Sequence, residues 1–415
     1  NKLPYVPQPF KLTIASDNIK KQYFIVKRLF DEASEIIVGT DSGQEGELIF
    51  RYIYTLTGCK RPFSRLWLSS LTNDALKKGF ENLKPGRDYD NLYYAGRARS
   101  ESDWILGINL TRLYTLKYAN PSIKMVSIGR VQTPTLNLVV KRYIDHTTFV
   151  KKPFFTPIIF IAHNGLIFPA KYEESFADKA GSDTILSVVK STIICSEVVE
   201  SVIKTSQPKL FNLSHLQQLC NNSFGMTAHK TLEIVQELYE SKFVTYPRTD
   251  SNYLSNDMID AANAAYNNII NFAPQITKDV TFDISSKSKN FNNDKVSDHH
   301  AIIPTEVSPD LLKLSNDQKL VYLTICERFL QAFAPTCEEN RIQLSFKEGS
   351  VPKVFKVAGK TPLNLGWKLV DLLGSYKPKD KKDDNKEDDE DGDLSLPRLE
   401  KGLDYSVSKK ETKQG

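Results

Sequence analysis

The feature that most constrains the fold of this chain is a change in residue pattern that occurs twice. Residues 150–205 and 341–370 are rich in β-branched and aromatic residues, which is typical of strands. Between them, residues 214–334 carry apolar residues at helical spacing. Since strands precede and follow the helices, we predict an antiparallel β domain that the chain leaves for a helical domain and then re-enters.

Local patterns place individual elements within these regions. In the first β region we predict strands at residues 154–162 and 184–189, with turns at residues 164–165 and 180–182. In the helical region, the periodic segments are residues 214–241, 257–272 and 317–334.

The first part of the chain has a different organisation. Residues 20–60 predict a helix, a strand and a second helix, which together form an αβα unit with acidic residues at the carboxyl end of the strand. Helical patterns follow over residues 73–118 and 129–143. The fold class is therefore α/β plus α+β, with several domains.

Length and composition narrow the class of protein. A chain of 415 residues can form two to four domains. Its five cysteines are scattered without a Cys-x-x-Cys pair, which predicts reduced thiols and neither a disulfide framework nor a zinc ribbon. No apolar run approaches the roughly 20 residues that span a bilayer. We therefore expect a cytoplasmic protein without a membrane partner.

The charge distribution favours a polyanionic partner. The formal net charge is +5. Residues 377–393 contain five lysines and nine acids, so they read as a solvated loop of net charge −4 and leave +9 for the remainder. That excess is consistent with a nucleic acid partner, although an ordinary basic protein would show it too.

The segment with the clearest chemical meaning reads Thr-Tyr-Pro-Arg-Thr-Asp-Ser and spans residues 245–251. A phenol is a weak nucleophile at neutral pH, so attack on phosphorus requires a nearby cation. Arg248 lies two residues beyond Tyr246 and can supply it, and Pro247 stiffens the backbone between them. The alternative is a tyrosine that only caps a strand.

A second segment has the residue pattern of a metal-binding site. Residues 40–47 read Thr-Asp-Ser-Gly-Gln-Glu-Gly-Glu, which puts Asp41 at the end of a buried strand and Glu45 and Glu47 at the start of a helix. Clustered carboxylates of this kind can hold Mg²⁺ through oxygen ligands and waters. The alternative is an acidic helix start that the helix dipole favours.

Three further segments carry weaker indications. Arg130 and Gln132 lie at a predicted helix start that could grip a phosphate backbone, or could be a plain N-terminus. Gln236 and Glu240 share a helix face that leads into the tyrosine segment, where Glu240 could orient a basic group or only face solvent. His299 adjoins a second histidine, and because neighbours point apart we expect a phosphate contact and not a shared metal.

Taken in order, these segments resemble the motifs of type IA DNA topoisomerases, and most closely those of bacterial topoisomerase III. Residues 97–103, 127–135 and 298–305 complete the set. The resemblance covers about residues 3–370. It implies a toroidal molecule with these parts: a partial Toprim α/β domain (1–60), a helical domain (61–147), a β-rich arch (148–210 and 337–370), a helical domain with the catalytic tyrosine (211–336), and the start of a return to the helical domain (371–415).

The resemblance also implies an activity. Tyr246 would attack a phosphate of single-stranded DNA and form a 5′-phosphotyrosine, another strand would pass through the break, and the 3′-hydroxyl would reseal it. Mg²⁺ would be the cofactor and ATP would not be needed. Such an enzyme relaxes negative supercoils or decatenates DNA, and a helicase partner is suggested as well.

The resemblance also implies roles for individual residues, according to their positions in the motifs. Arg248 and His299 would contact the scissile phosphate, Asp41 and Glu45 would bind Mg²⁺, and Glu240 would lie on the helix that supports Tyr246. The residues expected at the DNA strand are Arg99, Asp103, Ser127, Arg130, Gln132, Gln236, Thr245, Thr249 and Asp250.

Three departures from the family pattern generate alternatives. Gly43 stands where the family has a second aspartate, and we expect the chain to lack both a first Toprim strand with a glutamate and the final proline-rich segment. A truncated fragment that binds single strands without cutting is therefore one rival. A relaxase-type nickase is another, but it should have a spaced histidine cluster in place of adjacent histidines.

Overall fold

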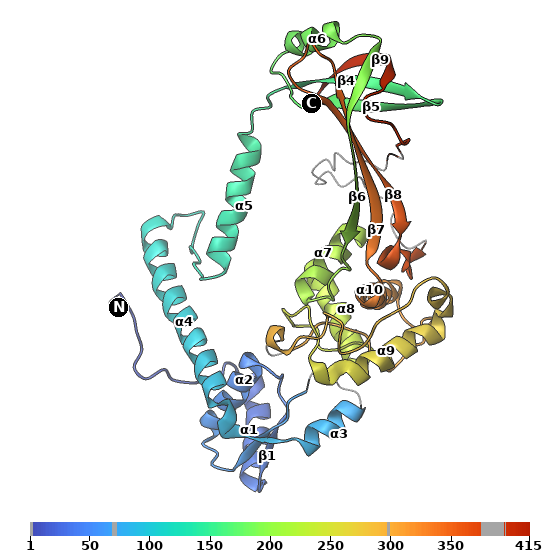
Figure 1. The fold of residues 1–415 in the computed structure, drawn as a ribbon. Coiled ribbons are helices and arrows are strands. Elements are labelled where there is room, and N and C mark those ends of the chain that lie inside the picture. Colours follow the sequence, from blue (N-terminus) through green and yellow to red (C-terminus); the bar gives the residue numbers. More distant parts are fainter. Residues whose placement is uncertain (1–2, 69–72, 297–298, 375–393, 395) are drawn as a thin grey trace.

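The computed structural model describes residues 3–68, 73–296, 299–374, 394 and 396–415, and the elements follow one another in a ring (Figure 1). The predicted acidic loop at residues 377–393 lies outside the described residues. In Figure 1 the N-terminal α/β unit is at the bottom, two long helices rise on one side, and a β-barrel lies at the top. A helical part descends on the other side and returns to the α/β unit.

The N-terminal unit confirms the predicted helix, strand and helix. It contains α1 (Asp17–Glu32), β1 (Ile36–Val38), α2 (Gln44–Thr57), β2 (Phe63–Arg65), α3 (Asn73–Glu81) and β3 (Lys84–Pro85). Strand β2 pairs in parallel with β1 and antiparallel with β3. Ile36, Val38 and Phe50 form a small core under this sheet, so the end of β1, where the acidic segment begins, is anchored from below.

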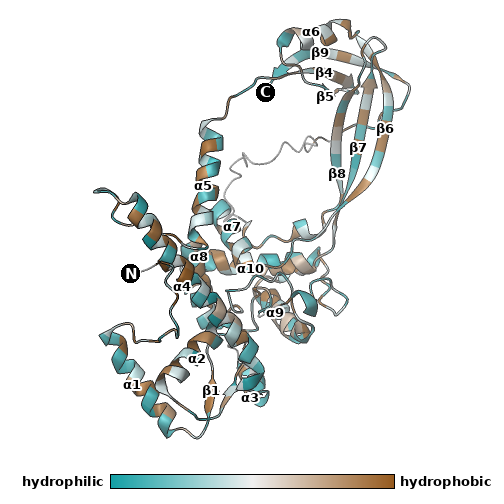
Figure 2. Ribbon diagram, turned by 90° about the vertical axis from the view of Figure 1, so that its left-hand side faces the viewer, coloured by the Kyte–Doolittle hydropathy of each residue, from teal (hydrophilic) through white to brown (hydrophobic). Residues whose placement is uncertain are grey.

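Two long helices connect this unit to the barrel. The predicted helix over residues 73–118 is interrupted by β3 and a short 3-10 helix, Gly86–Tyr89, before α4 (Asp90–Tyr118) begins. Helix α5 (Gln132–Thr147) follows and has no buried residue. Figure 2 shows hydrophobic positions along both helices, and some of their hydrophobic side chains are exposed, such as Leu116 and Leu138 at 82% and 67%. Among the described helices, none has the length and apolar character required to traverse a bilayer.

The predicted antiparallel β domain is a closed barrel. Its strands are β4 (Phe155–His163), β5 (Leu166–Tyr172), β6 (Thr192–Thr205), β7 (Cys337–Lys347), β8 (Phe355–Asn364) and β9 (Asp404–Gln414), in the order β4-β5-β8-β7-β6-β9. The chain leaves at the end of β6 and returns at the start of β7, and these two strands pair with each other. The predicted helical insertion between β segments is therefore confirmed.

Two sequence-based expectations for this part are wrong. Residues 184–189 were predicted as a strand but belong to α6 (Lys179–Val188), because the Asp178 side chain caps the helix and Ser182 and Leu186 are buried one turn apart. Residues 371–415 were expected to begin a return to the helical domain. Instead they end in β9, which pairs with β4 and β6, buries Tyr405 and closes the barrel.

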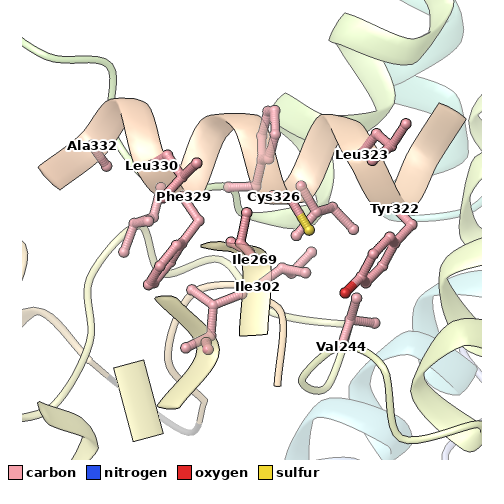
Figure 3. Packing of buried hydrophobic residues seen from close by; sticks show 14 of the residues in the cluster. Val244, Ile269, Ile302, Tyr322, Leu323, Cys326, Phe329, Leu330 and Ala332 are labelled. Atoms are coloured by element: carbon pink, nitrogen blue, oxygen red, sulfur yellow. The ribbon is translucent and has the colours of Figure 1, made fainter. Parts of the chain in front are cut away.

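The inserted helical part contains the largest core. Its main helices are α7 (Leu213–Phe224), α8 (Ala228–Glu240), α9 (Ile259–Phe272) and α10 (Asn316–Phe333), with the break between α7 and α8 at Gly225, whose φ is +68°. Helix α10 begins with a capping box at Ser315 and crosses the core. Figure 3 shows Phe329 and Tyr322 of α10 above Ile302 and Val244. The segment that leads into Tyr246 is therefore anchored in this core.

Removing one aromatic ring from this core should be costly. Phe329 is fully buried and its ring lies 5.1 Å from that of Phe333. We expect Phe329→Ala to lower the free energy of unfolding by about 3–5 kcal/mol because it leaves a cavity. Denaturant titration should show this in the transition of the helical part. The control is Leu312→Ala, at a side chain with 92% exposure, and a comparable loss there would contradict the packing described.

Candidate active site

The tyrosine segment is held by pairing with the histidine segment. Val244 forms a bridge with Pro304, the Thr245 amide donates to the Ile303 carbonyl at 2.9 Å, and the Thr305 amide donates to Phe243 at 3.1 Å. Both segments are extended and lie in the helical part, outside its helices. Backbone hydrogen bonds therefore set where Tyr246 stands relative to the adjacent histidines.

The side chains of two buried threonines add hydrogen bonds to this backbone pairing. Thr245 and Thr249 are buried at 2% and 5% exposure. The Thr245 hydroxyl donates to the Ala301 carbonyl and accepts from the Ile303 amide, and the Thr249 hydroxyl donates to the His299 carbonyl at 3.0 Å. The sequence placed both residues at the DNA strand. In the structure their side chains lie in the protein interior, where Thr249 holds the backbone of His299 and Thr245 holds that of Ala301 and Ile303.

Tyr246 stands in an aromatic environment. Its ring lies 4.4 Å from that of His299 and 5.4 Å, edge-on, from that of Tyr239. Burial raises the pKa of the Tyr246 phenol above its ordinary value, whereas a hydrogen bond with Arg248 lowers it. The phenol is therefore protonated at neutral pH, and its reaction depends on groups that stabilise or accept charge at the oxygen.

His299 is uncharged in this environment. Burial lowers its pKa to about 4, and His300 acts in the same direction. Its Nδ1 atom is buried without a hydrogen-bond partner among the described residues. A neutral imidazole still carries one N–H, so His299 can donate a hydrogen bond to a phosphate oxygen.

Arg248 and Asp41 bring two separate parts of the chain to one place. Arg248 Nη1 lies 3.9 Å from Asp41 Oδ2, and both side chains are more than half exposed. Asp41 also lies close enough to the Tyr246 phenol to raise its pKa. The predicted nucleophile, cation and acid therefore meet where the N-terminal unit faces the helical part.

A buried arginine fixes the position of Asp41. Arg65 is 1% exposed, and its guanidinium donates to the carbonyl groups of Val38, Thr40 and Asp41. Its Nε lies 3.2 Å from the Glu47 carboxylate, which Arg51 also contacts at 2.8 Å. The Glu47 carboxylate is fully buried between two arginines, so of the three acids in this segment only Asp41 and Glu45 are free to approach a metal.

The remaining acids of this segment suit a hydrated magnesium ion. Asp41 and Glu45 are exposed and Gly43 separates them. The described residues contain no group of three or more metal-ligating side chains. Mg²⁺ commonly keeps several waters and is held by one or two carboxylates together with substrate phosphates. Two exposed carboxylates beside a predicted phosphate site fit that requirement.

A second group of predicted residues lies on α4 and just before α5. Arg130 makes a two-pronged contact with Asp103, and the pKa of the Asp103 carboxyl is lowered by Arg130 and, to a lesser degree, by Arg99. Gln132 Nε2 donates to the Ser127 hydroxyl at 3.0 Å. Figure 1 places these helices across the ring from α7 and α8. The contacts described for these five residues do not reach Tyr246.

The last predicted residues lie near the tyrosine without a described contact to it. Gln236 Nε2 donates to Glu240 Oε1 at 2.9 Å on α8, which confirms that they share a helix face. Gln236 Oε1 is buried without a described partner. The Asp250 carbonyl accepts from Asn212, and the Asp250 side chain is exposed. A catalytic or DNA-binding role for these three residues stays a prediction.

Two residues of the site escaped the sequence reasoning. Tyr239 was treated only as an apolar position of α8, yet its ring packs on Tyr246. Arg65 was not singled out, although it organises the acidic segment. The one indication for Arg65 was an arginine at the end of a short β-rich stretch, which does not distinguish a buried clamp from a surface residue.

Comparison with known proteins identifies the family. The profile described as DNA topoisomerase matches residues 87–415. The chain belongs to the DNA topoisomerase family, of type IA, and is homologous to bacterial topoisomerase III.

Individual relatives agree with this assignment. The chain is 40% identical to "DNA topoisomerase 3" of Staphylococcus saprophyticus over 380 residues, which cover 89% of this chain and 52% of the relative. It is 35% identical to "DNA topoisomerase 3" of Bacillus subtilis over 415 residues, which cover 98% of this chain and 55% of the relative. The chain thus spans about half the length of these relatives.

A solved structure supports the fold. Full-length topoisomerase I from Thermotoga maritima superimposes with a TM-score of 0.69 at 23% identity, and the match covers 96% of this chain and 63% of that structure. At that identity the likeness concerns the fold, which is a mixed α/β multidomain fold of helices and a six-stranded barrel.

Adding a methyl group at Gly46 should disturb the acidic segment. A Cβ there would lie 2.1 Å from the Asp41 carbonyl oxygen, so the segment must move. We expect faster hydrogen exchange at the amides of residues 40–46 in Gly46→Ala, measured by mass spectrometry. Gly39→Ala is the matched control, since its Cβ would meet nothing within 4 Å. Equal exchange in both variants would contradict the close approach.

The depressed pKa of His299 should make stability depend on pH. Above pH 6.5 the residue is neutral in both folded and unfolded chains. Between pH 6.5 and about 4, His299 is protonated in the unfolded chain but stays neutral in the folded chain. The free energy of unfolding therefore falls as the pH falls. His299→Gln should remove up to about 3 kcal/mol of this pH-dependent loss.

Denaturant unfolding of wild type and His299→Gln at pH 7.5 and pH 4.5 measures this effect. His300 is present in both proteins. His146→Gln, at an exposed histidine of α5, is the control and should behave like wild type. An identical pH response in all three proteins would show that His299 titrates normally.

Proposed function

We propose that this chain carries the cleavage centre of a type IA DNA topoisomerase of the topoisomerase III kind. The observation that carries the proposal is the meeting of Tyr246, Arg248, His299 and Asp41 between the N-terminal unit and the helical part. Family membership supports the reaction class. Because the chain spans about half of its relatives, strand passage, relaxation of negative supercoils and decatenation are proposed for the whole protein.

Each of these four side chains has its own role in the proposed phosphoryl transfer. The Tyr246 oxygen attacks the phosphorus of a single-stranded DNA phosphate and an O–P bond forms. The bond to the 3′-oxygen breaks, and this oxygen takes up a proton from solvent to become the 3′-hydroxyl. Asp41 interacts with the phenol and is placed to accept its proton. Arg248 stabilises the negative charge that grows on the phosphate oxygens, and neutral His299 donates a hydrogen bond to one of them.

The reverse reaction reseals the strand. The 3′-hydroxyl attacks the phosphotyrosine, and the phenol leaves with a proton returned to its oxygen. One phosphodiester bond is exchanged for another of similar energy in each direction. ATP is therefore not required, which agrees with the absence of a Gly-x-x-x-x-Gly-Lys-Ser/Thr loop from the sequence.

Asp41 and Glu45 would hold Mg²⁺ in this scheme. When bound there, the ion would neutralise phosphate charge beside Arg248. Gly43 removes the carboxylate that the family pattern has between them, and Glu47 cannot replace it because Arg51 and Arg65 already hold it. We therefore expect the ion to be bound weakly and to depend on the DNA phosphate.

The second group of residues would hold the strand outside the cleavage centre. Arg99 and Arg130 offer positive charge, and Ser127 and Gln132 offer hydrogen bonds to the sugar-phosphate backbone. The arrangement in Figure 1 supports a toroidal molecule with the predicted division into Toprim, helical and arch domains. The exact domain boundaries, a cytoplasmic location and a helicase partner stay predictions.

An adduct assay tests the proposed chemistry. The protein is incubated with a single-stranded oligonucleotide labelled at its 3′ end, with and without Mg²⁺, and denatured. We expect a labelled covalent adduct that resists denaturation in wild type and disappears in Tyr246→Phe. Tyr239→Phe is the matched control, because it removes a hydroxyl from the neighbouring ring and leaves the nucleophile in place.

Other results of the adduct assay would support other interpretations of the site. An adduct that persists in Tyr246→Phe would mean that another residue is the nucleophile. Strand binding without any adduct would favour the rival interpretation, a binding fragment that does not cut. Loss of the adduct in Tyr239→Phe as well as in Tyr246→Phe would mean that the hydroxyl of the neighbouring ring is also required.

A further inference from the structure

The boundary between residues 3–85 and residues 211–336, which we call the seam, lacks an apolar core. Three clusters of buried hydrophobic residues are found in the described part of the chain, and none includes residues from both sides of the seam. Polar side chains make the direct contacts across the seam, including Arg248 with Asp41. An interface without apolar burial loses little free energy when it opens.

One polar contact across the seam comes from an unusual residue. Lys242 has a φ of +70°, a conformation that glycine and asparagine adopt far more readily than lysine. Its side chain extends from the end of α8, and its Nζ donates to Asn73 Oδ1 of α3 at 3.2 Å. The positive φ is the left-handed turn that ends α8, because the amides of Lys242 and Phe243 donate to the carbonyls of Tyr239 and Leu238.

Lys242 is also tied directly to the tyrosine segment. Its amide donates to the Tyr239 carbonyl at 2.8 Å, and its carbonyl accepts from the Thr305 hydroxyl. Three residues separate it from Tyr246. A displacement of the Lys242 side chain would therefore also displace residues 243–246, which include the proposed nucleophile Tyr246.

The charges beside this contact are complementary. A cavity of about 500 Å³ lies in the seam, with Lys78 and Lys84 on the side of the N-terminal unit. Asp257, Asp260 and Glu306 line the opposite side. Attraction across such a gap acts at a distance and is weakened by salt. It favours closure without the tight packing that would prevent opening.

We propose that Lys242 is a positioning residue, whose ammonium group latches α3 to the helical part and sets the balance between a closed and an open seam. In the closed seam Asp41 reaches Tyr246 and Arg248, and in the open seam it does not. The latch itself rests on geometry alone. Its use in catalysis rests on the proposed function, because strand passage requires an opening next to the cleaved phosphate.

Substitutions that change the charge at position 73 offer a graded test of the latch. Asn73→Asp turns the hydrogen bond into an ion pair and should shift the closed-to-open ratio upward, whereas Asn73→Lys opposes two ammonium groups and should shift it downward. An exposed contact of this kind supports changes of about threefold in each direction. Asn18→Lys makes the same charge change on α1, away from the seam, and should have no effect.

Fluorescence energy transfer measures the ratio directly, in DNA-free protein. The five native cysteines are buried, so dyes can be attached at Lys77→Cys on α3 and Leu312→Cys in the helical part. The differences between the Asn73 variants should shrink in 1 M salt, where the screening length is only about 3 Å. They should also disappear when Lys242→Gly is added, a change that relaxes the backbone and removes the ammonium.

Two results would overturn the latch. One is an unchanged ratio in Asn73→Asp and Asn73→Lys, and the other is a charge effect that survives Lys242→Gly. The oligonucleotide adduct assay keeps the two proposals separate. A latch response without any adduct would contradict the proposed chemistry and leave the latch standing, whereas an adduct without a latch response would do the opposite.

Discussion

The structure of the site depends on the pairing of two extended segments, residues 243–249 and 299–305. Their backbone hydrogen bonds place Tyr246 against His299, and the buried hydroxyls of Thr245 and Thr249 complete the pairing from inside. Because Val244 and Ile302 belong to the core that α10 crosses, the nucleophile is supported by the most heavily packed part of the molecule. A reactive side chain on irregular backbone is thereby held as firmly as one on a helix.

The second half of the site is supported differently. Asp41 lies at the end of a short strand, in a unit with a small core, and buried Arg65 holds the local carbonyl groups in place. The two halves meet through an exposed ion pair, Arg248 with Asp41, and a hydrogen bond from Lys242 to Asn73. Each half is rigid and the contact between them is weak. That combination suits a reaction in which the site must assemble, separate and assemble again.

The sequence predicted the parts of the site whose chemistry is local. Tyr246 and Arg248 are two residues apart, so their partnership could be inferred without the fold. The contact with Asp41 joins residues about two hundred positions away and needed the structure. Thr245 and Thr249 have polar side chains that suggest a ligand, and only tertiary packing shows that their partners are backbone carbonyls. The same limit applies to α6 and β9, where capping and barrel closure overrode the local residue pattern.

The central claim is that both halves act on one phosphate. The most direct measurement is a crystal structure of Tyr246→Phe with a single-stranded oligonucleotide, which cannot be cleaved through this residue. The account predicts a phosphate next to the ring at position 246, within hydrogen-bond distance of Arg248 and His299 and facing Asp41. A strand bound only along α4 and α5, with no phosphate between the two halves, would contradict it.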